Sequence, residues 1–287
     1  MKPGIVVLFG MTSFLAAALL FSVQPMIGKM VLPVLGGTPA VWNTCLVYFQ
    51  VMLLCGYLFA HGIVQTKSPV RKRVSGRYLC VLALLLALGY ALQPIAIAPG
   101  ALSGSIERNP AIVLLGILVI SASLPLLMVS ATAPLLQGWF ALCPHPRASD
   151  PYFLYAASNA GSLAALVAYP LLIEPALGLS VQSQFWRSGF LVLAILVFCC
   201  GAVARWLSRT AVVQNYNDLR VVSASLDLAT KSTNVSRVDL ARWLVLVFIP
   251  SSWLLGVTAY LTTDLAAIPL LWVIPLTIYL SDRKSVV

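Results

Sequence analysis

The chain contains 287 residues, of which 60% are hydrophobic and 9% are charged, and its formal net charge is +10. Soluble domains carry about 25% charged residues, so this composition excludes a soluble globular enzyme. The high hydrophobicity excludes a disordered chain as well. The class that remains is an all-α integral membrane protein surrounded by the lipid bilayer. Nucleic-acid binding is not expected, because the chain has no polar domain that could carry it.

Eight apolar stretches divide the chain, and each is close to the roughly 20 residues that a helix needs to cross a bilayer. In chain order they are residues 5–27, 40–64, 78–98, 111–133, 152–173, 188–207, 241–260 and 264–281. Lys2 precedes the first stretch, as in a secretory signal, but no clear small-residue cleavage site follows. We therefore expect the first stretch to be a retained signal-anchor helix.

The eight stretches predict three parts. A six-helix membrane bundle covers residues 1–207, a polar cytoplasmic loop covers 208–240, and two further transmembrane helices cover 241–281. Six helices followed by a long cytoplasmic loop are typical of transporters built from six-helix halves. The last six residues, 282–287, end an apolar helix without forming a loop, and we expect them to be a non-native tail.

The basic residues predict the orientation of the chain, because Lys and Arg collect in cytoplasmic loops. With a cytoplasmic N-terminus and eight crossings, 15 of the 18 Lys and Arg residues lie inside, and the three outside are Lys29, Arg108 and Arg187. The sequence therefore predicts a multi-pass protein of the inner (plasma) membrane with both ends in the cytoplasm. By this count the net charge of +10 reports topology and not a nucleic-acid partner.

Motifs that would indicate catalysis or metal binding are absent from the sequence. It contains no G-x-G-x-x-G, P-loop, G-x-S-x-G or H-E-x-x-H pattern. The six cysteines form no C-x-x-C pair, and five of them lie in apolar runs without a histidine cluster. We therefore predict no catalytic residue, no metal site and no cofactor in this chain.

Uncharged polar residues in or beside the apolar stretches are candidates for lining a substrate path. They are Gln24, Asn43, Gln50, Ser158 and Asn159. The alternative explanation is hydrogen bonding between helices, which contributes about 0.6 kcal/mol per bond in membrane proteins. The sequence leaves both explanations open.

Four charged residues are predicted at the outer ends of helices: Lys29, Glu174, Arg187 and Asp264. They could form an outer polar vestibule with Lys29–Glu174 or Arg187–Asp264 pairs, or they could be interfacial charges that reach the lipid headgroups. In the first case Lys29, Glu174 and Asp264 are candidates for the mouth of the path, and the two acids would attract a cation. Residues 262–264 also predict a tight turn that caps the last helix.

Two features of the apolar stretches predict helix shape and packing. Ala157, Gly161 and Ala165 repeat at four-residue spacing, which predicts a face where another helix approaches closely. Pro125 and Pro134 predict a kink in the fourth helix and the end of its straight part.

Several patches of sequence resemble a bacterial family. They are residues 24–25, 29, 32–33, 36–45, 48–50, 56–57, 60–61, 149–159, 174–175, 177–179, 182–183, 250–252 and 262–264. In these patches the chain resembles the fused major-facilitator/spermidine-synthase-like membrane proteins, most specifically over residues 24–61. The resemblance covers most of the chain except 208–240 and the last six residues.

The resemblance implies a multi-helix membrane region that precedes an aminopropyltransferase-like domain in longer members. No part of such a domain is present in this sequence, so no catalytic residue or cofactor site can be assigned by the resemblance. We expect the membrane region of a transporter-like protein that handles a polyamine or another small cation. The alternatives are a membrane anchor or scaffold for a C-terminal aminopropyltransferase-like domain, and a structural partner within the membrane.

Overall fold

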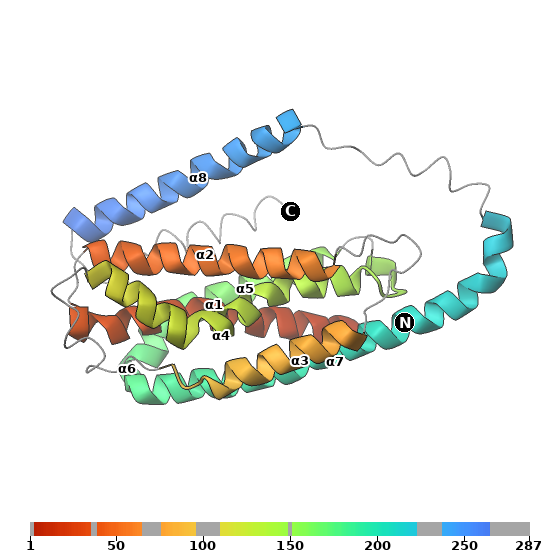
Figure 1. Ribbon diagram of the computed structural model, residues 1–287, viewed down its shortest axis with the longest axis horizontal. Helices are drawn as coiled ribbons and strands as arrows, with labels where there is room; N and C mark the ends of the chain where they lie inside the picture. The colour runs from red at the N-terminus through yellow and green to blue at the C-terminus, as the bar shows by residue number, and fades with distance from the viewer. Residues whose placement is uncertain are drawn as a thin grey trace.

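The computed structural model describes residues 3–35, 39–64, 76–95, 110–148, 151–222 and 237–264, whose regular structure is entirely helical (Figure 1). The helices are α1 (Pro3–Leu35), α2 (Pro39–Val64), α3 (Gly76–Ala91), α4 (Pro110–Phe140), the 3₁₀-helix η2 (Pro146–Ala148), α5 (Tyr152–Ala168), the π-helix η3 (Tyr169–Ile173), α6 (Glu174–Ala176), α7 (Leu179–Val222) and α8 (Arg237–Asp264).

Five segments of the described residues are long and apolar enough to cross a membrane. They are Gly4–Pro33, Ala40–Ile63, Ala111–Phe140, Tyr152–Ala176 and Leu179–Ser208. Large apolar side chains point away from the bundle, with Ile120 79% exposed and Leu84 and Phe185 each 68% exposed. An exposed apolar surface of this kind suits contact with lipid. The helices also satisfy their own backbone hydrogen bonds, as the bilayer interior requires. The predicted membrane class is thus supported, while the count of eight spans and the transporter-like layout stay predictions.

Contacts between helices give their relative directions. Ser13 on α1 bonds to Leu154, and Lys29 pairs with Glu174, so α1 runs parallel to the segment from α5 to α6. Hydrogen bonds from Tyr48 to Leu118 and from Ser130 to Met52 make α2 and α4 parallel. The start of α7 meets the middle of α1, where Trp186 Nε1 donates to the Leu19 carbonyl, and its later part meets the beginning of α1. The bundle therefore consists of parallel pairs crossed by the antiparallel α7.

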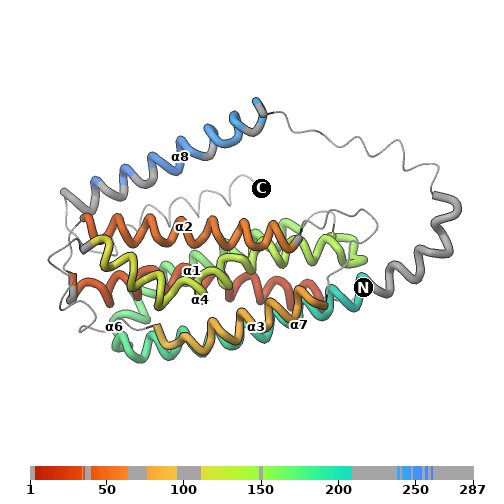
Figure 2. Tube along the Cα trace, in the orientation of Figure 1, coloured from red at the N-terminus to blue at the C-terminus, as the bar shows by residue number. Residues whose placement is uncertain are grey.

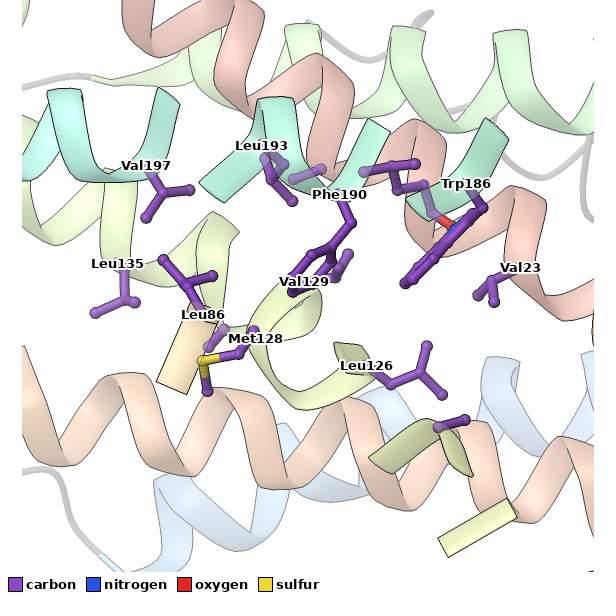
Figure 3. Close-up of a cluster of buried hydrophobic side chains, with 14 of the residues drawn as sticks. Val23, Leu86, Leu126, Met128, Val129, Leu135, Trp186, Phe190, Leu193 and Val197 are labelled. Carbon is purple, nitrogen blue, oxygen red and sulfur yellow. The ribbon is translucent and has the colours of Figure 1, made fainter. Parts of the chain in front are cut away.

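The core is built from apolar side chains of α1, α2, α3, α4, α5 and α7, and Figure 3 shows the part between α1, α3, α4 and α7. It includes Val23, Leu86, Leu126, Met128, Val129, Leu135, Trp186, Phe190, Leu193 and Val197. Trp186 and Phe190 stack with their ring centroids 5.7 Å apart. This packing fixes the positions of the helix ends that carry the polar residues described below.

Helix α8 lies on the α2 side of the bundle (Figures 1 and 2). All of its side chains that the structure describes are exposed, including Phe248 at 70% and Trp253 at 75%. The predicted turn at residues 262–264 is instead the last part of α8. The eighth predicted stretch and the expected non-native tail fall outside the described residues, apart from Asp264.

Several helix ends differ from the sequence prediction, most clearly those of α4 and α7. α4 continues past Pro134 to Phe140, although this proline deprives the Ser130 carbonyl of its usual donor four residues later. The buried side chains of Leu135, Leu136 and Trp139 hold this last part of the helix in the core. α7 begins at Leu179 and not at 188, and it continues to Val222, so residues 208–222 of the predicted polar loop are helical.

Candidate functional site: a polar cluster at one end of the bundle

The predicted fifth helix changes its hydrogen bonding before it ends. α5 stops at Ala168, the π-helix η3 follows, and Glu174 begins the three-residue helix α6. Pro170 and Pro175 lie in this segment, and neither has an N–H to donate. Short π-helical turns within α-helices are often found at functional sites. The segment thus places Glu174 in an irregular part of an otherwise apolar helix.

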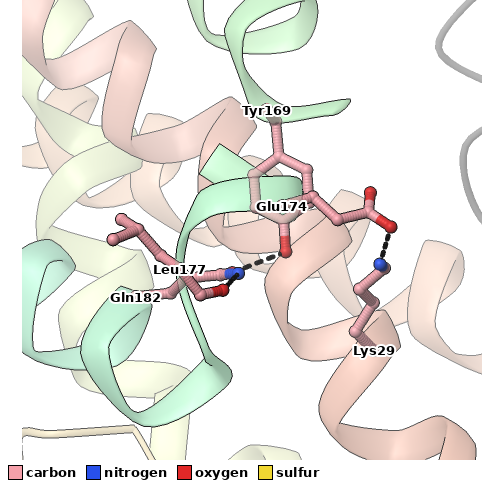
Figure 4. Close-up of polar contacts among 5 residues, drawn as sticks. All are labelled: Lys29, Tyr169, Glu174, Leu177 and Gln182. Atoms are coloured by element: carbon pink, nitrogen blue, oxygen red, sulfur yellow. Dashed lines mark hydrogen bonds and ion pairs between the residues drawn. The ribbon is translucent and has the colours of Figure 1, made fainter. Parts of the chain in front are cut away.

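Two hydrogen bonds hold the connection from η3 to α7 (Figure 4). The Tyr169 hydroxyl donates to Gln182 Oε1 at 2.8 Å, and Gln182 Nε2 donates to the Leu177 carbonyl at 2.8 Å. Tyr169 is 1% exposed and Gln182 is 5% exposed, so the bond between them is buried, while the bond to Leu177 is partly buried. Leu177 has extended backbone angles, and these bonds fix the turn in which it lies.

Lys29 and Glu174 form an ion pair between α1 and α6 (Figure 4). Lys29 Nζ contacts Glu174 Oε1, and the two side chains are 25% and 24% exposed. The second carboxylate oxygen, Glu174 Oε2, is buried and has no hydrogen-bond partner among the described residues. An ionised carboxylate can accept hydrogen bonds on both oxygens. The geometry therefore leaves one acceptor of Glu174 available to a donor.

The end of α3 brings another polar side chain to the same end of the bundle. Gln93 is 6% exposed, and neither of its amide atoms has a partner among the described residues. Ser183 Oγ donates to the Ile95 carbonyl at 2.7 Å and so ties this segment to α7. Buried amide groups without partners are costly, which makes Gln93 a second group capable of binding a polar ligand.

Arg187 packs against an aromatic ring of α3. Its Cζ atom lies 4.7 Å from the centre of the Tyr90 ring, a cation–π arrangement between α7 and α3. The partner predicted for it was Asp264, the last residue of α8, whose side chain lies outside what the structure describes. Of the two predicted ion pairs, the structure therefore contains Lys29–Glu174.

The uncharged candidates occupy two kinds of position. Gln24 on α1 and Ser158 and Asn159 on α5 are half-buried. Asn43 and Gln50 on α2 are exposed on the outer surface of the described bundle. The structure thus places the α1 and α5 candidates at partly buried positions, while the two on α2 do not face the helices packed against it.

Tyr169, Gln182 and Gln93 were not among the predicted site residues. For the two glutamines the sequence offered only a weak signal, which is a polar residue beside an apolar stretch. Gln93 precedes Pro94, and Gln182 and Ser183 come shortly before the stretch that begins at residue 188. Their importance depends on contacts between segments, such as the bond from Tyr169 across the α6–α7 turn. Within the described residues, no group of three His, Cys, Asp or Glu side chains could hold a metal ion.

Comparison of the chain with models of protein families, with curated proteins and with solved structures gives no match.

Proposed function

We propose that this chain is the membrane region of a transporter-like protein and that it binds a small cation through Glu174. The class of ligand that fits this site is an amine, and a polyamine is the case suggested by the family that residues 24–61 resemble. The observation that carries the proposal is the buried, unpartnered Oε2 atom of Glu174 beside an oxygen already paired with Lys29.

A carboxylate at this depth suits a cation for electrostatic reasons. Water screens charges poorly where the side chain is three-quarters buried, so an ammonium group gains more from Glu174 there than at a fully exposed position. Ionisable groups within membrane-spanning segments are rare and usually serve a function. Gln93, at the same end of the bundle, offers an amide oxygen that could accept from a second amine of an extended ligand.

Lys29 gives the site a way to remain stable when no ligand is bound. An unpaired buried carboxylate would be strongly unfavourable, and Lys29 provides the neutralising charge. An incoming ammonium group competes with Lys29 for the carboxylate, and Lys29 returns to Oε1 when the ligand leaves. The proposal thus treats the ion pair as an exchangeable contact between α1 and α6.

Both helices that carry the pair contain features that allow local movement. Pro25 and Pro33 lie inside α1 on either side of Lys29, and η3 precedes Glu174. Prolines and π-helical turns weaken the regular hydrogen bonding of a helix. In transporters, substrates bind near interrupted helices of this kind. The expected path continues along α1 and α5 past Gln24, Ser158 and Asn159.

The test is uptake of radiolabelled spermidine into liposomes that contain the purified chain. We expect Glu174→Gln to reduce the initial rate at least tenfold, because the amide cannot neutralise an ammonium group. Asp239→Asn is the matched control, since it removes an exposed carboxylate from the first turn of α8. It should leave uptake unchanged.

A second pair of variants separates binding from folding. Lys29→Met alone leaves Glu174 unpaired, whereas the double variant with Glu174→Met removes both charges and should restore stability without restoring uptake. Unchanged uptake after neutralising both Glu174 and Asp264 would overturn the cation mechanism. If a longer form of the protein shows aminopropyl transfer and no uptake, the membrane region is instead a scaffold.

A further inference from the structure

A continuous apolar groove runs along the outside of the α3–α7 pair, separate from the polar cluster around Glu174. One part has a volume of about 360 Å³, and the adjoining part has a volume of about 410 Å³. On α3 the two parts are lined by residues 76, 79, 80, 83, 86, 87 and 90, and on α7 by 191, 194, 195, 198, 199, 202, 205 and 206. These positions follow helical spacing on each helix, and Phe198 lines both parts, so the groove is one stripe.

The groove faces outward from the bundle. Phe198 is 46% exposed and Ile195 is 56% exposed, although both are large apolar side chains. The lining on α7 extends from Leu191 to Trp206, which corresponds to about 22 Å at 1.5 Å per residue. This length exceeds the roughly 15 Å depth of one leaflet of the hydrocarbon core, so an entire acyl chain can lie along the groove.

Two arginines lie at the Gly76 end of the groove, whereas at the opposite end Arg187 contacts the ring of the lining residue Tyr90. The Arg205 guanidinium lies against the backbone of Gly76, where a Cβ atom would come within 2.9 Å of Nη2. Arg77, on the first turn of α3, is exposed beside it, and Trp206 is 57% exposed. Tryptophan is enriched at the level of lipid headgroups, and arginine binds phosphate groups with two parallel hydrogen bonds. The Gly76 end is the one that the distribution of Lys and Arg predicts to be cytoplasmic.

We propose that the α3–α7 groove binds an anionic phospholipid, with one acyl chain along the apolar lining and the phosphate at Arg205. The apolar stripe selects a hydrocarbon chain, and the positive charge at the Gly76 end selects a negative headgroup. Basic pockets between transmembrane helices bind anionic headgroups by the same combination. The proposal does not depend on the function assigned to Glu174.

The test uses the full chain in nanodiscs containing equal amounts of phosphatidylglycerol and phosphatidylcholine. After extraction into mild detergent, native mass spectrometry counts the lipids of each class that remain bound. Arg205→Gln is expected to reduce the preference for phosphatidylglycerol about fivefold, equivalent to about 1 kcal/mol. Arg205→Lys keeps the charge and should retain most of the preference.

Two further variants make the result specific. Ala202→Trp fills the groove between Phe198 and Arg205 and should reduce binding of both lipids. Arg242→Gln removes an exposed arginine from α8 and should leave the preference unchanged. An unaltered preference in Arg205→Gln, with normal circular dichroism, would overturn the headgroup site. Cross-linking of two copies through Cys80 and Cys199 in place of bound lipid would show that a second chain covers the groove.

Discussion

The parallel pair α1–α5 and the antiparallel pair α3–α7 pack in different ways. In the first pair, Gly161 lies against the backbone of α1, and a Cβ atom there would come within 2.9 Å of the Phe14 carbonyl carbon. In the second pair, Gly89 faces a side chain, with its Cβ position 3.2 Å from Cζ of Phe190. Without a strong hydrophobic force inside lipid, helices associate through close packing and hydrogen bonds. Backbone contact thus closes the α1–α5 interface, whereas side-chain contact leaves a groove along the α3–α7 interface.

The largest expected effect comes from making the same substitution in both pairs. Gly161→Ala should lower the free energy of unfolding by about 2–3 kcal/mol, because the Phe14 backbone cannot move aside. Gly89→Ala should change it by less than about 0.5 kcal/mol, because the Phe190 ring can shift and alanine favours the helix. Unfolding in mixed micelles followed by tryptophan fluorescence measures both. Equal losses for the two variants would contradict the comparison.

A second parallel pair extends the comparison with a smaller effect. Gly56 on α2 faces α4, where an added Cβ would lie 2.8 Å from Ser130 Cβ and 2.9 Å from the Ala131 nitrogen. We expect Gly56→Ala to destabilise the protein by about 1–2 kcal/mol. Adding Ser130→Gly removes the nearer obstacle and should recover part of that loss, which a double-mutant cycle would detect as coupling. Strict additivity would show that the two residues do not meet.

The smallest effects concern one buried hydroxyl in each pair. Ser13 donates to the Leu154 carbonyl at 3.0 Å, and Ser183 donates to the Ile95 carbonyl at 2.7 Å. Ser13→Ala should cost about 0.6 kcal/mol, because Leu154 lies within α5 and its carbonyl can also accept the helical bond. Ser183→Ala should cost about 1–1.5 kcal/mol, because Ile95 lies beyond the end of α3. The same unfolding assay tests whether this order holds.

The sequence predicts the existence of the helices better than their ends. Long apolar runs locate α1, α2, α4, α5 and α7, because length and hydrophobicity are sufficient to indicate a span. The start of α7 was missed because Gln182 and Ser183 appear polar in the sequence. Both are buried in the structure, and their hydrogen bonds to Leu177 and Ile95 compensate for that burial.

Helix packing and the charged residues likewise divide into what local sequence predicts and what depends on tertiary contacts. The four-residue spacing of Ala157, Gly161 and Ala165 correctly predicted a face for close approach, because helical periodicity is a local property. The Lys29–Glu174 contact was one of two predicted pairs, and charge and depth alone could not choose between them. The choice depends on how α1 packs beside α5, and this packing cannot be predicted from any local sequence pattern.

The π-helix before Glu174 decides which way that side chain faces. In a regular α-helix, residues five apart are about 140° apart around the axis, so Glu174 would point well away from the direction of Tyr169. In η3 the Glu174 N–H instead bonds to the Tyr169 carbonyl, five residues earlier, which reduces the angle between the two residues. Tyr169 faces the interior, and Glu174 meets Lys29 on α1. The extra residue in this turn thus changes the face of the helix on which Glu174 lies, and in the structure that face meets Lys29.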